Sequence, residues 1–196
     1  MSQPLASRPG AVVDRSEPRP VAEVIKDYVT ITKPKHQFVL LTCWTSLTLA
    51  GGTTPGRLLF ILVTTAMAVA SSHVFNQLID TDIDAKMTRT RNRPLAAGRI
   101  SRTGAAVYGA ILGIASFLLM LWQVNLLTAL LIAAGFIIYV PVYTWWLKRR
   151  TPWCTLVGGA SGAMPALIGW TAVTGRIDVI PMLLFAFMVI WQSPHF

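Results

Sequence analysis

The sequence predicts an all-α integral membrane protein with six transmembrane helices. Of its 196 residues, 54% are hydrophobic and 13% are charged, whereas a typical soluble domain carries about 25% charged residues. Several windows free of Asp, Glu, Lys and Arg approach the roughly 20 apolar residues that cross a bilayer. We place six spans at residues 37–52, 58–79, 104–123, 126–146, 153–174 and 179–192.

The basic residues support these spans independently of hydropathy. Fifteen of the 17 Lys and Arg residues lie before the first predicted span or in the loops after the second and fourth, and only Arg57 and Arg176 lie in the opposite loops. Because positively charged loops stay on the cytoplasmic side, we expect a multi-pass protein of the cell inner membrane with a cytoplasmic N-terminus. The alternative is the mitochondrial inner membrane. Basic residues gathered at span ends indicate a lipid bilayer as partner and no nucleic acid.

The first 24 residues differ in composition from the rest of the chain. They contain four prolines and a mixture of acidic and basic residues, and they lack the apolar run of a signal peptide. We therefore predict a disordered cytoplasmic tail at residues 1–24 and a transmembrane domain at residues 25–196.

A polar cluster stands at the end of the second predicted span. Asn76, Asp80 and Asp84 are spaced by four residues, so on a helix each step rotates by about 40° and the three side chains share one face. Asp82 falls on roughly the opposite side. Carboxylate and amide oxygens suit Mg²⁺, which usually takes one or two carboxylates and leaves its other positions to water and phosphate. The spacing therefore predicts part of a magnesium and diphosphate site.

Basic residues follow this cluster directly, at Lys86, Arg89, Arg91 and Arg93. Guanidinium groups close to a metal suit a bound polyanion. The alternative is an ordinary solvated loop at the membrane edge whose charges pair with one another. Asn76 and His73 lie deeper in the span, where polar groups are costly unless they face a cavity, and this favours a site.

The residues of this segment resemble a known motif. Asn76, Asp80 and Asp84, followed by Met87, RT at 89–90 and RPL at 93–95, are similar to the first aspartate-rich motif of the UbiA superfamily of intramembrane prenyltransferases. Three further segments agree in the same order: YVTITKPK at 28–35, YTWWLKRRTP at 143–152 and WQSPHF at 191–196. Cys154 departs from the pattern, since the family commonly has Asn there.

The resemblance implies a nine-helix bundle of which this chain holds six helices, with the C-terminal part absent. The family's second acidic motif is expected beyond Phe196. We therefore expect a fragment of a longer protein, and half of the metal site would be missing from the fragment, which makes its activity on its own doubtful.

The motif form is most similar to those members of the superfamily that act on heme. The resemblance then implies transfer of a farnesyl group from farnesyl diphosphate to a vinyl group of heme b to make heme O, with Mg²⁺ as cofactor. The resemblance also implies heme A synthase or cytochrome oxidase assembly factors as partner proteins. By motif match the implied catalytic residues are Asp80, Asp84, Arg89 and Arg93; the metal ligands are Asn76, Asp80 and Asp84; and the substrate contacts are Asn76, Lys33, Tyr143, Lys148, Arg149, His73 and His195.

Two other functions stay open. A prenyltransferase with an aromatic acceptor such as 4-hydroxybenzoate would share the metal site and differ in its acceptor pocket. A transporter or a noncatalytic assembly subunit would also explain acidic residues within a membrane domain.

Overall fold

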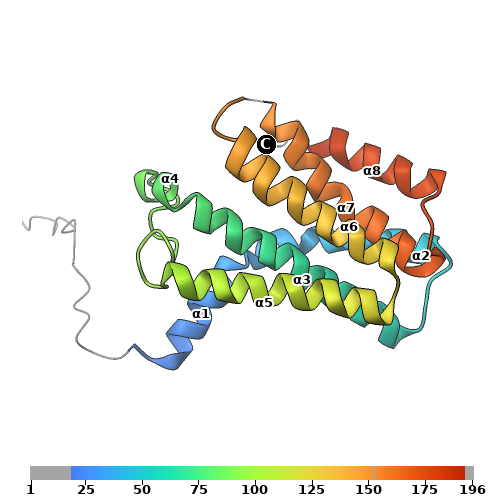
Figure 1. Ribbon diagram of the computed structural model, residues 1–196, viewed down its shortest axis with the longest axis horizontal. Coiled ribbons are helices and arrows are strands. Elements are labelled where there is room, and N and C mark those ends of the chain that lie inside the picture. The colour runs from blue at the N-terminus through green and yellow to red at the C-terminus, as the bar shows by residue number, and fades with distance from the viewer. Residues whose placement is uncertain (1–18, 152, 193–196) are drawn as a thin grey trace, which may run out of the picture.

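The computed structural model describes residues 19–151 and 153–192, and these form a bundle of helices without strands (Figure 1). His195 and the remainder of residues 193–196, together with residues 1–18 and Pro152, lie outside the described part. The elements are α1 Val21–Ile31, η1 Pro34–Val39, α2 Leu40–Leu49, α3 Pro55–Ile79, α4 Thr81–Lys86, α5 Arg102–Gln123, α6 Leu126–Ile137, η2 Ile138–Leu147, α7 Cys154–Thr174 and α8 Val179–Gln192.

Within the described residues, four helical stretches are long and apolar enough to cross a membrane: α3, α5, α7 and the continuous stretch 126–147 formed by α6 and η2. The other two predicted windows are shorter as helices, because α8 has 14 residues and window 37–52 contains the 10-residue α2. The all-α membrane class is thus confirmed, whereas six full-length spans are not. The tail boundary predicted at residue 24 falls inside α1, which begins at Val21.

The helices are joined by small residues and by hydroxyl groups that bond to backbone carbonyls. Ser71 donates to the carbonyl of Gly109 at 2.7 Å, between α3 and α5, and Ser46 donates to the carbonyl of Ala166 at 2.5 Å, between α2 and α7. A Cβ atom on Gly169 would overlap the backbone of α2. Lipid is as apolar as a helix surface, so close packing and such bonds hold membrane helices together.

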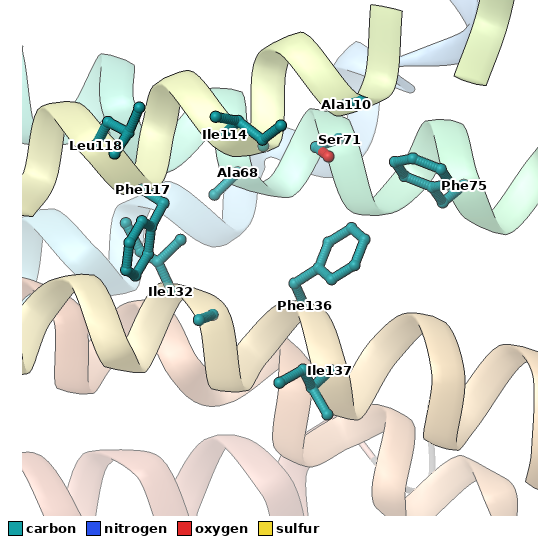
Figure 2. Close-up of a pocket in the computed structure, with 12 residues that line it drawn as sticks. Ala68, Ser71, Phe75, Ala110, Ile114, Phe117, Leu118, Ile132, Phe136 and Ile137 are labelled. Carbon is teal, nitrogen blue, oxygen red and sulfur yellow. The ribbon is translucent and has the colours of Figure 1, made fainter. Parts of the chain in front are cut away.

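An apolar cavity of about 440 Å³ lies among α3, α5 and α6 (Figure 2). Phe75, Phe117 and Phe136 line it from the three helices. By helical spacing, Phe75 points to roughly the opposite side of α3 from Asp80, about 140° away. The cavity is therefore separate from the polar cluster at the end of α3.

The polar cluster lies at one end of the bundle. Figure 1 shows α4, the end of α1 and the loop between η2 and α7 at this end, which also carries the basic loops. The fold thus brings three separate stretches of the chain, near residues 33, 80 and 148, to one place.

Candidate active site

The three predicted oxygen donors lie along one wall, although the single helix predicted through them is wrong. Helix α3 ends at Ile79, and Asp80 (φ −85°, ψ 5°) separates it from α4. The hydroxyl of Thr81 bonds to the carbonyl of Gln77 at 2.8 Å, and such side-chain bonds compete with the helical ladder. Bonds with the helical spacing still run from the Asp80 N–H to Asn76 and from the Asp84 N–H to Asp80. The four-residue backbone register therefore survives the break, and the carboxylates of Asp80 and Asp84 both lie near enough to Lys33 to raise its pKa.

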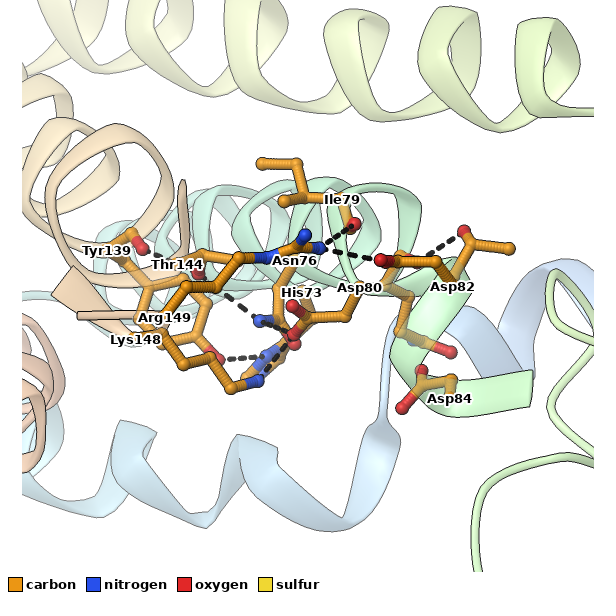
Figure 3. Close-up of polar contacts among 12 residues, drawn as sticks. His73, Asn76, Ile79, Asp80, Asp82, Asp84, Tyr139, Thr144, Lys148 and Arg149 are labelled. Atoms are coloured by element: carbon orange, nitrogen blue, oxygen red, sulfur yellow. Dashed lines mark hydrogen bonds and ion pairs between the residues drawn. The ribbon is translucent and has the colours of Figure 1, made fainter. Parts of the chain in front are cut away.

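A continuous chain of polar contacts runs from Lys33 through Asn76 and Asp80 to Lys148. Figure 3 shows the part of this chain formed by Asn76, Asp80, Thr144 and Lys148. Lys33 Nζ donates to Asn76 Oδ1 at 2.9 Å, and Asn76 Nδ2 donates to Asp80 Oδ2 at 3.0 Å and to Thr144 Oγ1 at 3.2 Å. Lys148 Nζ donates to the same Asp80 oxygen at 2.5 Å. Asn76 and Asp80 are 4% and 2% exposed, so these contacts are shielded from solvent.

Unusual backbone conformations aim both lysines at the site. Lys33 has φ 51°, the one positive φ of a non-glycine residue in the described part of the chain, and such conformations are costly and gather at functional sites. Lys148 follows the π-helical segment η2, whose interior contains Pro141. Proline lacks the N–H that an α-helix requires, and π-helical turns occur frequently at functional sites. The wider turn ends with Lys148 N–H bonded to the carbonyl of Tyr143 at 2.9 Å.

Among the residues that the structure describes, Asp84 forms an ion pair with Arg93 and not with either lysine. Arg93 Nη1 donates to both carboxylate oxygens, at 2.9 and 2.7 Å, and Asp84 is 6% exposed. The hydroxyl of Thr90 also bonds to the Asp84 carbonyl at 3.0 Å. These bonds fold the loop after α4 back onto the acidic wall.

The two carboxylates and three cations form one electrostatic cluster. Burial, together with the positive charges of Arg93 and Lys148, lowers the pKa of Lys33 to about 8, against the opposing effect of the carboxylates of Asp84 and Asp80. A buried lysine with a lowered pKa loses its proton readily unless an anion is near. The three cations outnumber the two carboxylates, so the cluster carries a net positive charge that favours the binding of an added anion.

Several predicted residues lie at the margin of the cluster. Asp82 points away from the wall, as predicted, and pairs at 2.8 Å with Arg149, which lowers the pKa of the exposed Asp82 carboxyl. Arg89 is exposed and makes no ion pair within residues 19–151 and 153–192. The ring of Tyr143 lies against Gly158, where a Cβ would come within 3.0 Å of it.

His73 lies one helical turn before Asn76 on α3. His73 is buried, and its Nδ1 lies 3.4 Å from the hydroxyl of Tyr139. Tyr139 in turn stacks on Tyr143 at 5.3 Å between ring centroids. His36, which the sequence gave no reason to include, lies edge to face with His73 at 5.5 Å.

Another residue that the sequence did not single out is Asp27, which is 7% exposed. It accepts hydrogen bonds from Arg19 at 2.7 Å and from Arg99 Nε at 3.2 Å, and Arg99 also bonds to the carbonyl of Asn92 at 3.1 Å. This contact ties α1 to the loop that carries Arg93. No local spacing could have indicated it, because Asp27 and Arg99 are 72 positions apart.

One atom of the wall fits a metal ion. Asp80 Oδ1 is buried and has no hydrogen-bond partner in the described part of the chain, although an unpaired buried polar atom is costly. No group of three or more His, Cys, Asp or Glu side chains is arranged for metal binding within the same residues. A free carboxylate oxygen beside an amide suits Mg²⁺, which needs few protein ligands when phosphate oxygens complete its shell.

These features define a multi-pass helical membrane protein with buried acids and facing cations at one end of its bundle. The chain belongs to the UbiA prenyltransferase family, which matches residues 39–196. It is 45% identical over 177 residues to the protoheme IX farnesyltransferase of Symbiobacterium thermophilum, covering 89% of this chain and 59% of that protein. It is 42% identical over 199 residues to the protein of that name from Gloeobacter violaceus, covering 100% and 64%. The chain thus spans about three-fifths of the length of these relatives.

Two solved structures share the fold. One, described as a digeranylgeranylglyceryl phosphate synthase in membranes, has a TM-score of 0.73 at 19% identity and covers 87% of this chain and 60% of its own. The other is a UbiA homologue from Archaeoglobus fulgidus bound to GPP and Mg²⁺, with a TM-score of 0.68 at 18% identity, covering 84% and 60%. At this identity the likeness shows the helical arrangement alone.

Proposed function

We propose that this chain forms part of a prenyltransferase that moves a farnesyl group from farnesyl diphosphate to a vinyl group of heme b, giving heme O. The proposal places the protein in the cell inner membrane with its basic end in the cytoplasm, because positive loops stay on that side. Relatives named protoheme IX farnesyltransferase support it, since they match nearly the whole chain at 40–45% identity.

The observation that supports the proposal most directly is the burial and hydrogen bonding of the Asp80 carboxylate. This carboxylate is 2% exposed, and one of its oxygens accepts hydrogen bonds from Lys148 and Asn76. Its other oxygen has no hydrogen-bond partner among the residues that the structure describes. Asp80 and Asp84, with Asn76 between the lysines, are the residues that would hold Mg²⁺. Mg²⁺ bound there would stabilise the negative charge of a departing diphosphate.

The lysine and arginine side chains of the site would bind the diphosphate directly. Lys33, Lys148 and Arg93 converge on the wall and would exchange their carboxylate partners for diphosphate oxygens. When the allylic C–O bond breaks, its electron pair leaves with the diphosphate, and fixed cations favour that step. The vinyl π electrons then form the new C–C bond, and water adds to the resulting cation with loss of a proton. No protein nucleophile is needed, and the apolar helices keep water away from the first cation. The roles predicted for Arg89, Tyr143, Arg149 and His195 stay predictions.

A paired substitution tests the proposal. Full-length protein is incubated with farnesyl diphosphate, heme b and Mg²⁺, and heme O is measured by mass spectrometry. Asp80→Asn should lower product formation by about 100-fold or more, the scale of lost transition-state stabilisation. Asp82→Asn is the matched control, because this carboxylate lies two positions away and is exposed. Equal activity of Asp80→Asn and the control would refute the role of Asp80.

The same assay separates the alternatives. Product with 4-hydroxybenzoate and none with heme b would refute the heme assignment while keeping the prenyltransferase. No transfer to either acceptor would favour a transporter or an assembly subunit. Removal of Mg²⁺ with EDTA should abolish product, and added Mg²⁺ should restore it. Co-purification with heme A synthase or with oxidase assembly factors would test the proposed partner proteins.

A further inference from the structure

His36 stands at the rim of the candidate site with both ring nitrogens available. The backbone N–H of His36 bonds to the carbonyl of Lys33 at 2.9 Å, which fixes it one turn beyond the lysine that reaches Asn76. Its ring is exposed, and neither ring nitrogen has a hydrogen-bond partner within residues 19–151 and 153–192. An aromatic neighbour holds the ring on one side, since His73 lies edge to face with it at 5.5 Å.

His36 and His73 differ in what they can bind. His73 is 9% exposed and its Nδ1 is directed at the hydroxyl of Tyr139, so its ring packs against neighbouring groups and is not free to bind a ligand through Nδ1. Partial burial and the positive charges of Lys33 and Arg93 lower the pKa of His36 below its ordinary value, which favours the neutral imidazole. A neutral imidazole is a common ligand of heme iron.

We propose that His36 binds the iron of the heme acceptor and so positions the porphyrin beside the diphosphate site. This inference rests on the proposed function, because it takes heme as the acceptor. The rings of His73, Tyr139 and Tyr143 contact one another in order, with His73 edge to face with Tyr139 and Tyr139 stacked on Tyr143, and an apolar macrocycle packs well against aromatic rings. A vinyl group must come close to the allylic carbon to react, and a single iron ligand on the same rim as Lys33 restrains the macrocycle there.

Heme titration of the full-length protein without farnesyl diphosphate tests the inference. Ferric heme b is added to wild type, His36→Ala and Lys35→Ala, and the Soret band and resonance Raman spectrum report the iron ligand. Lys35 is the matched control because it is the exposed neighbour of His36 and makes no ion pair in the described part of the chain. Wild type and Lys35→Ala should show histidine ligation.

His36→Ala should lose that signature and bind heme at least about tenfold more weakly, the scale on which lost groups around a metal act. Added imidazole should restore the spectrum. Binding of farnesyl diphosphate to His36→Ala, measured in parallel, shows that the variant is folded.

Two outcomes are distinguishable from a failure of the proposed function. An unchanged spectrum and affinity in His36→Ala would overturn the assignment of His36, even where wild type converts heme b to heme O. Absence of heme O from wild type, with a histidine signature that depends on His36, would refute the transfer reaction and leave the heme ligand in place.

Discussion

Lys148 should be much more important for stability than its neighbour Arg149, because their carboxylate partners differ in burial. Asp80 is 2% exposed at its side chain, whereas Asp82 is 55% exposed. Removing one partner of a buried ion pair costs roughly 3–5 kcal/mol, since the other charge is left unpaired. Lys148 is itself 34% exposed, so solvent screens the pair, and we expect about 2 kcal/mol for Lys148→Met.

Thermal unfolding in detergent, followed by tryptophan fluorescence, measures this difference. At about 2–4 °C per kcal/mol for a chain of this size, Lys148→Met should lower the Tm by about 4–8 °C. Arg149→Met should lower it by less than half as much. The double variant Asp80→Asn, Lys148→Met should melt above Lys148→Met, because the unpaired charge is gone. The reasoning would be refuted if Lys148→Met melted within about 1 °C of wild type, or if the double variant recovered nothing.

Two further predictions concern helix packing and loop anchoring. Gly169→Ala places a Cβ against the backbone of α2, so it should lower the free energy of unfolding by about 1–3 kcal/mol, as overpacking does. Gly56→Ala is the control, because there is open space around its Cβ. In the same unfolding assay, Gly56→Ala should be neutral or slightly stabilising. Similar melting of the two variants would contradict the packing. Asp27→Asn should speed amide hydrogen exchange across residues 92–99, because it weakens the contact between Arg99 and α1. Glu23→Gln is the control, because the Glu23 side chain is 60% exposed, and it should leave that exchange unchanged. Equal effects of the two variants would contradict a role of Asp27 in holding this loop against α1.

The local part of the site could be predicted from the sequence because helical spacing fixes it. Asn76, Asp80 and Asp84 recur every four residues, and the structure keeps them on one wall with Asp82 turned away. The spacing did not reveal the break at Asp80. Helical periodicity describes a regular helix, and a break that keeps the backbone bonds from Asp80 to Asn76 and from Asp84 to Asp80 does not change that pattern.

Membrane character was also determined by the sequence alone. A bilayer requires long apolar helices whose backbone hydrogen bonds are internal. The length and hydropathy of such helices can be read directly from the sequence. The windows at 58–79, 104–123, 126–146 and 153–174 became helices of span length. Whether the shorter windows cross the membrane depends on their neighbours, so length and hydropathy left that undecided.

Only the tertiary structure decided which charges meet. Lys148 reaches Asp80 from 68 positions away, Lys33 reaches Asn76 from 43, and His36 reaches the ring of His73. These contacts depend on how α3, η1 and η2 pack and on a π-helical turn around Pro141. The sequence specifies side chains and local periodicity, whereas the pairing of distant groups follows from packing that buries many residues at once.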